Sequence, residues 1–69
     1  MSDPLARAAL AAEHVTKGRI IVAKQRALIA RLRSLGHDCD PAETLLRQFE
    51  RSLSIFEQDL ADLAERART

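Results

Sequence analysis

The chain has 69 residues, a net charge of +1 and a single cysteine. A domain of this length needs a stabiliser beyond its core, which seldom contributes more than about 3 to 5 kcal/mol. The lone Cys39 excludes a disulfide framework, and the sequence has no paired Cys or His residues typical of a structural zinc site. Association with another chain is the remaining common stabiliser.

The composition predicts one helical, cytoplasmic domain over residues 1–69. Ala, Leu, Arg and Glu dominate, with only two glycines and two prolines. No apolar run approaches the about 20 residues that span a bilayer, and the start lacks the basic residues of a secretory signal. We therefore expect no membrane contact.

The first predicted element is a helix over about residues 4–35. Ser2 or Asp3 would cap it, and Pro4 suits its first turn. Gly36 can adopt the left-handed conformation that closes a helix. Along this helix, mostly apolar residues recur at alternating steps of three and four, as in a coiled coil, and we call such a row, which should face the partner helix, a seam. The first seam comprises Ala8, Ala11, Val15, Gly18, Val22, Gln25, Ile29 and Leu32.

A turn over residues 36–40 leads to a second helix over about 41–67. Asp40 is its predicted N-cap, because the residue before Pro41 is disfavoured in a helix, and Glu43 completes a capping box. A connection this short makes the two helices antiparallel neighbours. The second seam comprises Ala42, Leu46, Phe49, Leu53, Phe56, Leu60, Leu63 and Ala67.

Pairing the two seams gives one register, in which paired residue numbers sum to 78 and Gly18 lies opposite Leu60. We interpret Gly18 as a site of close packing and not as a hinge. In this register, a row of arginines beside the first seam faces a row of glutamates beside the second, each with a spacing of seven residues. Such flanking pairs set the orientation of the helices more than their stability. The predicted ion pairs are Arg19 with Glu57, Arg26 with Glu50, and Arg33 with Glu43.

The opposite flank of the seams is apolar on the first helix. The facing residues there are His14 with Arg66, Ile21 with Asp59, Leu28 with Ser52, and Leu35 with Leu45. A lone hairpin would leave this stripe open to water, so we expect a second copy to cover it in a four-helix-bundle homodimer. The predicted interface residues are Ile21, Gln25, Leu28, Leu35 and Leu45. Gln25 either bonds its symmetry mate and selects the register, or reaches the solvated rim.

A resemblance supports the same fold. Over about residues 14–56 the sequence resembles short helical-hairpin proteins of unassigned function that are common in soil alphaproteobacteria. The Gly-His-Asp turn and the Gln-Arg pair are its most specific parts, and the resemblance implies a fold without implying an activity. The residues that carry it are His14, Gly18, Gln25, Arg26, Leu28, Ile29, Gly36, His37, Asp38, Ala42, Glu43, Leu46, Phe49, Glu50 and Leu53.

The predicted turn gathers four side chains of metal-ligating type, His37, Asp38, Cys39 and Asp40. Their spacing matches no standard zinc pattern, so we interpret them as a plain turn. In it Asp38 bonds backbone amides and His37 covers the end of the first helix. No Cys-His or Ser-His-Asp grouping assembles along the hairpin. We therefore predict a protein that is not an enzyme and binds no metal or cofactor.

These features favour a self-associating structural or protein-interaction module, whose partner is a second copy or another helical protein. The alternative is weak, sequence-independent binding of a nucleic-acid backbone through a basic outer face of the first helix. That face comprises Arg7, Lys17, Lys24 and Arg31. We favour an ordinary solvated face, because both phenylalanines belong to the seam and leave no aromatic side chain for base stacking.

Overall fold

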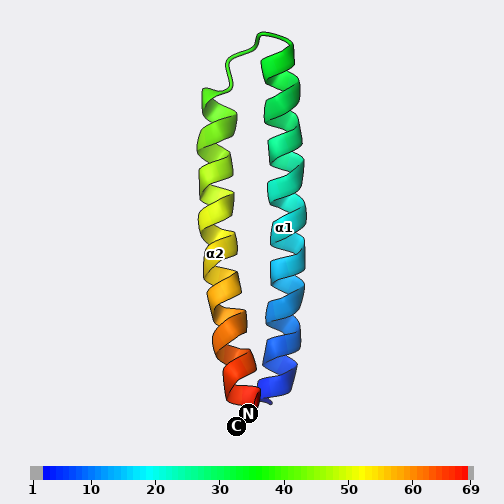
Figure 1. Cartoon of the computed structure of the whole chain (residues 1–69), viewed down its shortest axis with the longest axis vertical. Coiled ribbons are helices and arrows are strands. Elements are labelled where there is room, and N and C mark those ends of the chain that lie inside the picture. The colour runs from blue at the N-terminus through cyan, green and yellow to red at the C-terminus, as the bar shows by residue number, and fades with distance from the viewer. Residues whose placement is uncertain (1–2, 69) are drawn as a thin grey trace.

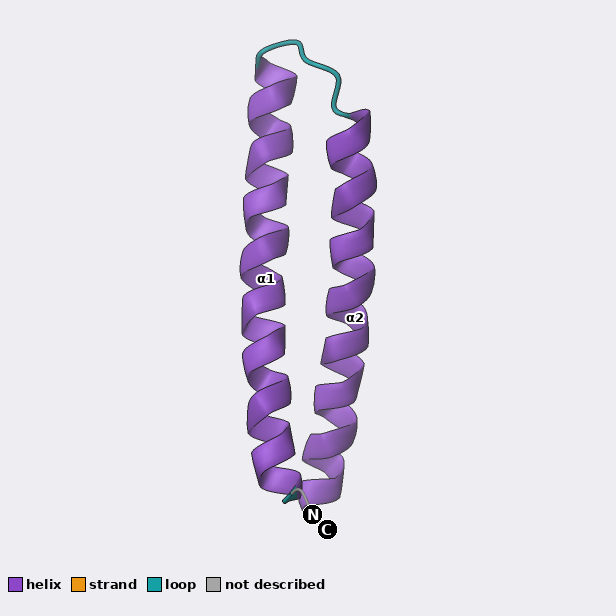
Figure 2. Cartoon of the chain, turned by 180° about the vertical axis from the view of Figure 1, so that it is seen from behind, coloured by secondary structure: helices purple, strands orange, loops and turns teal. Residues whose placement is uncertain are grey.

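The chain folds into a hairpin of two antiparallel helices (Figure 1). A computed structural model describes residues 3–68, in which α1 spans Pro4–Ser34 and α2 spans Asp40–Arg68. The hairpin measures 52 × 18 × 14 Å, with the connecting loop at one end and both termini at the other. Figure 2 shows the two helices side by side from behind. Their ends lie within one residue of the predicted ends.

The start of α1 is capped by the residue before its proline. The Asp3 side chain accepts a hydrogen bond from the Leu5 amide at 3.1 Å. Pro4 lacks an amide hydrogen at the first helical position, where a helix has no partner for one. Ser2, the other candidate cap, lies outside the described residues.

The end of α1 is closed by a Schellman motif. Gly36 has a φ of 73°, a left-handed conformation that residues with a Cβ rarely adopt. Its amide donates to Arg33 O at 3.1 Å, and the His37 amide donates to Leu32 O at 2.9 Å. The glycine stop that the sequence predicts is therefore present.

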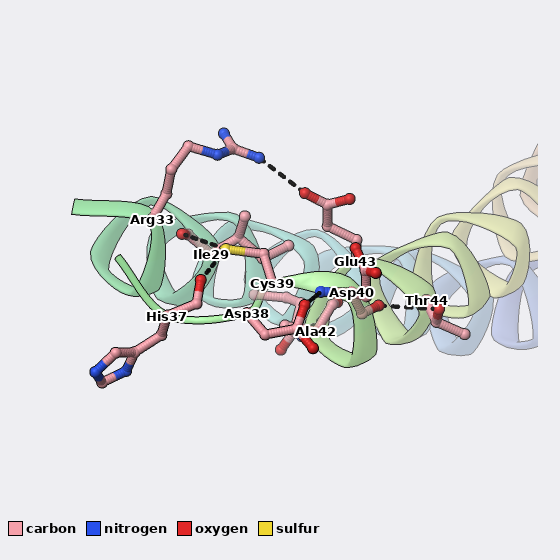
Figure 3. Close-up of polar contacts among 10 residues, drawn as sticks. Ile29, Arg33, His37, Asp38, Cys39, Asp40, Ala42, Glu43 and Thr44 are labelled. Carbon is pink, nitrogen blue, oxygen red and sulfur yellow. Dashed lines mark hydrogen bonds and ion pairs between the residues drawn. The ribbon is translucent and has the colours of Figure 1, made fainter. Parts of the chain in front are cut away.

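The start of α2 differs from the prediction. Asp40 lies within the helix, and the first helical hydrogen bond runs from the Glu43 amide to Cys39 O at 2.8 Å. The Asp38 side chain accepts from the Asp40 amide at 3.0 Å, so Asp38 and Cys39 together close the end that Asp40 was expected to cap (Figure 3). The Glu43 carboxylate pairs with Arg33 and forms no capping box.

The core is thin and lies along the seam. The buried residues of the described chain all belong to α1, namely Ala11, Val15, Val22, Gln25 and Ile29. The α2 seam is half-buried, except for Phe56, which is exposed. Two helices alone cannot enclose a seam on all sides, so the hairpin leaves part of its apolar surface in contact with water.

The register of the seams is shifted by one heptad from the predicted one. A Cβ built on Gly18 would lie 3.1 Å from Leu53 Cδ1, whereas the sequence places Leu60 opposite this glycine. The cause is the path of residues 37–39, which run back along α1 before α2 begins (Figure 1). Cys39 Sγ consequently lies 3.8 Å from Ile29 O. The close packing predicted at Gly18 is present, with a different neighbour.

Candidate functional site

The seam divides the hairpin into two broad faces, of which one carries the predicted ion pairs. The distances between the charged atoms are 3.1 Å for Arg19–Glu57, 2.7 Å for Arg26–Glu50 and 2.8 Å for Arg33–Glu43. We call this side the charged face. All six side chains remain well exposed to water, so each pair contributes only about 0.2 to 1 kcal/mol.

These ion pairs form although the core register is shifted. Side chains on a helix lean toward its N-terminus, and in an antiparallel hairpin the two sets lean toward each other. An arginine on α1 therefore meets a glutamate that lies further from the loop on α2, as Figure 3 shows for Arg33 and Glu43. The long arginine and glutamate side chains reach across the axial separation between their backbones, which the shorter core side chains could not bridge.

The other side is the apolar face. It is formed by the exposed residues Leu10, Ile21, Leu28, Leu35, Leu45, Ile55 and Phe56. Ile21 and Leu28 are 44% exposed and Leu35 is 59% exposed. The heptad repeat explains this grouping. On α1, each arginine of the ion pairs directly follows a seam residue, whereas Ile21 and Leu28 directly precede the seam residues Val22 and Ile29. The two sets therefore lie on opposite sides of the seam. The predicted open stripe is therefore exposed in the hairpin.

Part of the apolar face was not identified from the sequence. Leu10 lies one helical turn before His14, and Ile55 lies one helical turn after Ser52, so neither belongs to the rows of the predicted stripe. Phe56 was assigned to the seam. A signal for Leu10 was available, because Leu10 and Ile21 are eleven residues apart, close to three full turns of a helix. Phe56 is 36% exposed, and the register shift brings its ring beside His14.

A hollow of about 450 Å³ opens on the apolar face near the termini. Its lining residues are Arg7, Leu10, Ala11, His14, Phe56, Asp59, Asp62, Leu63 and Arg66. The rings of His14 and Phe56 stack with their centroids 5.4 Å apart. The sequence instead places His14 opposite Arg66, and the stacking on Phe56 is a consequence of the register shift. The hollow is thus lined by both apolar and charged side chains.

Gln25, one of the predicted interface residues, is buried within the hairpin and does not lie on the exposed apolar face. Its side chain is 9% exposed, and its Nε2 donates a hydrogen bond to Ala42 O at 2.9 Å. Of the two predicted roles, solvation at the rim does not match this buried position. Because residues 37–39 run back along α1, the first turn of α2 lies within reach of this amide. Gln25 therefore joins the first turn of α2 to the loop-side half of α1.

The basic residues assigned to the alternative function line one edge of the apolar face. Lys17 Nζ lies 3.4 Å from Glu13 Oε1, and Arg7 stands at the rim of the hollow. Lys24 and Arg31 follow at seven-residue intervals from Lys17 and are exposed. The row forms a charged border to an apolar surface, an arrangement that suits the rim of a protein interface.

The turn is held by backbone contacts. Cys39 Sγ lies 3.5 Å from His37 O as well as near Ile29 O. Figure 3 shows the His37 ring directed away from the other labelled residues. The Asp38 side chain bonds a backbone amide, as the sequence predicts.

Comparisons with family models, with curated proteins and with solved structures found no match to this chain. Within residues 3–68, no group of three or more His, Cys, Asp or Glu side chains is arranged to hold a metal ion. Neither described helix is long and apolar enough to cross a bilayer. The feature that remains for a functional argument is the apolar face with its hollow.

Proposed function

We propose that this protein is a non-enzymatic helical module that acts by self-association, in which two hairpins bury their apolar faces against each other as a four-helix homodimer. The exposure of seven large apolar side chains on one face carries this proposal. Contiguous apolar surface of this kind is a mark of protein interfaces. A homodimer is the simplest solution, since a two-fold axis lets one surface cover its own copy.

The size of the apolar face suits a stable interface. The broad side of the hairpin measures 52 by 18 Å, which compares with the about 800 Å² that each partner buries in an interface of standard size. Two such hairpins would convert the half-buried α2 seam and the exposed leucines into the centre of a bundle. The thin core of a single hairpin gives the chain a thermodynamic reason to associate.

Association to a dimer can be tested on the unmodified chain. Light scattering after size exclusion should give twice the mass of the 7.7 kDa chain at high concentration. The melting temperature should rise with protein concentration, because folding then includes association. A chain that stays folded and monomeric at tens of micromolar, with a melting temperature independent of concentration, would contradict the proposal.

A further inference from the structure

The apolar face differs between its two ends. Toward the loop, Leu28 and Leu45 are exposed, at 44% and 40%. Toward the termini, the same face opens into the hollow of about 450 Å³, whose apolar residues include Leu10 and Leu63. The loop end therefore offers two exposed leucines, and the other end offers a hollow that is lined in part by exposed apolar side chains, including Leu10 and Phe56.

We propose that the two copies of the dimer pack head to tail, with their loops at opposite ends, so that Leu28 and Leu45 of each copy fill the hollow of the other. This inference rests on the proposed homodimer and adds its geometry. The hollow is then a binding site for leucine side chains of a second copy, and it is incomplete in a single chain.

The spacing of these residues along the helices supports this arrangement. The midpoint of α1 is residue 19, and Leu28 and Leu10 lie at equal distances on either side of it. The midpoint of α2 is residue 54, and Leu45 and Leu63 are likewise equidistant from it. A two-fold axis across the middle of the hairpin therefore brings Leu28 of one copy over Leu10 of the other. Because Gly18 lies beside Leu53, the same axis brings Leu45 to within about one helical turn of Leu63.

The alternative arrangement, with both loops at the same end, fits less well. It would set the two hollows against each other and the loop-end leucines against each other. An unfilled space of that size loses the close packing that protein interiors maintain. The head-to-tail arrangement does bring the basic edges of the two copies together near Lys17 and Lys24. These side chains are exposed, and like charges at a solvated rim cost little compared with a void.

Distances between spin labels distinguish the two arrangements. In a Cys39→Ser background, one nitroxide is attached at the exposed tip through His37→Cys, and in a second sample at the midpoint of α2 through Ser54→Cys. Head-to-tail packing predicts a tip-to-tip distance approaching the 52 Å length of the hairpin and a clearly shorter midpoint distance. Packing with the loops together predicts a short distance at both positions, a few helix spacings of about 10 Å.

A short tip-to-tip distance in a dimer would overturn the head-to-tail geometry and leave the proposed homodimer standing. The absence of any dipolar coupling at both positions, in a chain that scattering shows to be monomeric, would overturn both. As a residue-level check, a Leu10→Cys chain and a Leu28→Cys chain are mixed in the same background under mild oxidation. The mixed disulfide should greatly exceed either homodimeric one, and equal or smaller yields would contradict the predicted contact.

Discussion

The two faces of the hairpin have the same helices and the same heptad spacing, yet only one of them is complete within the chain. On the charged face, each glutamate of the repeating row has an arginine partner. On the apolar face, the repeating row of Ile21, Leu28 and Leu35 remains open to water. Charges thus help to direct α2 back along α1, whereas the apolar row leaves an exposed surface that the proposed second copy would cover.

The largest expected effect comes from placing a charge on the apolar face. Leu28→Glu should destabilise the folded dimer by several kcal/mol, because the carboxylate would be buried without a partner in the interface. Ile20→Glu is the matched control, since Ile20 is 50% exposed on the same helix but lies outside the apolar face. Its effect should stay within about 0.5 kcal/mol. Both free energies of unfolding come from urea titrations at one protein concentration.

Equal effects of the two substitutions would contradict the distinction between this face and the rest of α1. The mass from light scattering adds a second readout, since Leu28→Glu should shift the protein toward the monomer while Ile20→Glu leaves the dimer intact. A Leu28→Glu chain that remains dimeric would show that Leu28 lies outside the interface.

A second prediction tests the seam between the faces. Gly18→Val should cost about 1 to 3 kcal/mol, because the added side chain would meet Leu53, whose Cδ1 lies 3.1 Å from a Cβ at this position. Adding Leu53→Ala should recover part of the loss, while adding Leu60→Ala should recover none. Rescue by Leu60→Ala in a double-mutant cycle would instead support the register predicted from the sequence.

The register shows where sequence reasoning reached its limit. The Asp3 cap, the glycine stop and the ion-pair rows depend on residues a few positions apart or on a fixed heptad repeat, so they could be predicted directly. The same local signals misplaced the cap of α2, where the side chain of Asp38 and not that of Asp40 bonds an amide at the start of the helix. The seam register depends on how far residues 37–39 run back along α1, which no periodicity encodes. A heptad repeat looks the same after a shift of seven residues, so Leu53 could replace Leu60 opposite Gly18 without disturbing the pattern.

The candidate site was predictable to the same degree. The exposed row on α1 follows from its spacing of seven residues, because that row lies opposite the charged one. The hollow could not be predicted, since it depends on the shifted position of Phe56 beside His14. The role of Gln25 was missed for the same reason, because its partner, Ala42 O, comes within reach only when α2 starts alongside the last turns of α1 and not at its end.

A third prediction concerns this buried amide. Gln25→Leu should cost about 1 kcal/mol, because the leucine fills a similar volume but cannot donate to Ala42 O. Gln58→Leu is the control, since Gln58 donates to Asp62 Oδ1 on an exposed surface, where water replaces the lost bond. Urea titration measures both. A loss at Gln58 as large as that at Gln25 would mean that burial of the amide contributes nothing.

The smallest effect is expected on the charged face itself. Arg26→Glu should weaken the hairpin by less than about 1 kcal/mol, and adding Glu50→Arg should restore it, because the two side chains meet at 2.7 Å while remaining in contact with water. The coupling energy from a double-mutant cycle should fall as salt is raised, since solvent ions screen exposed charges. The loss of stability caused by Leu28→Glu should persist at high salt, because salt ions hardly change the free energy of losing an apolar contact or of burying a charge. A coupling energy on the charged face that is insensitive to salt would show that this face is also covered in the assembly, and the contrast between the two faces would then be lost.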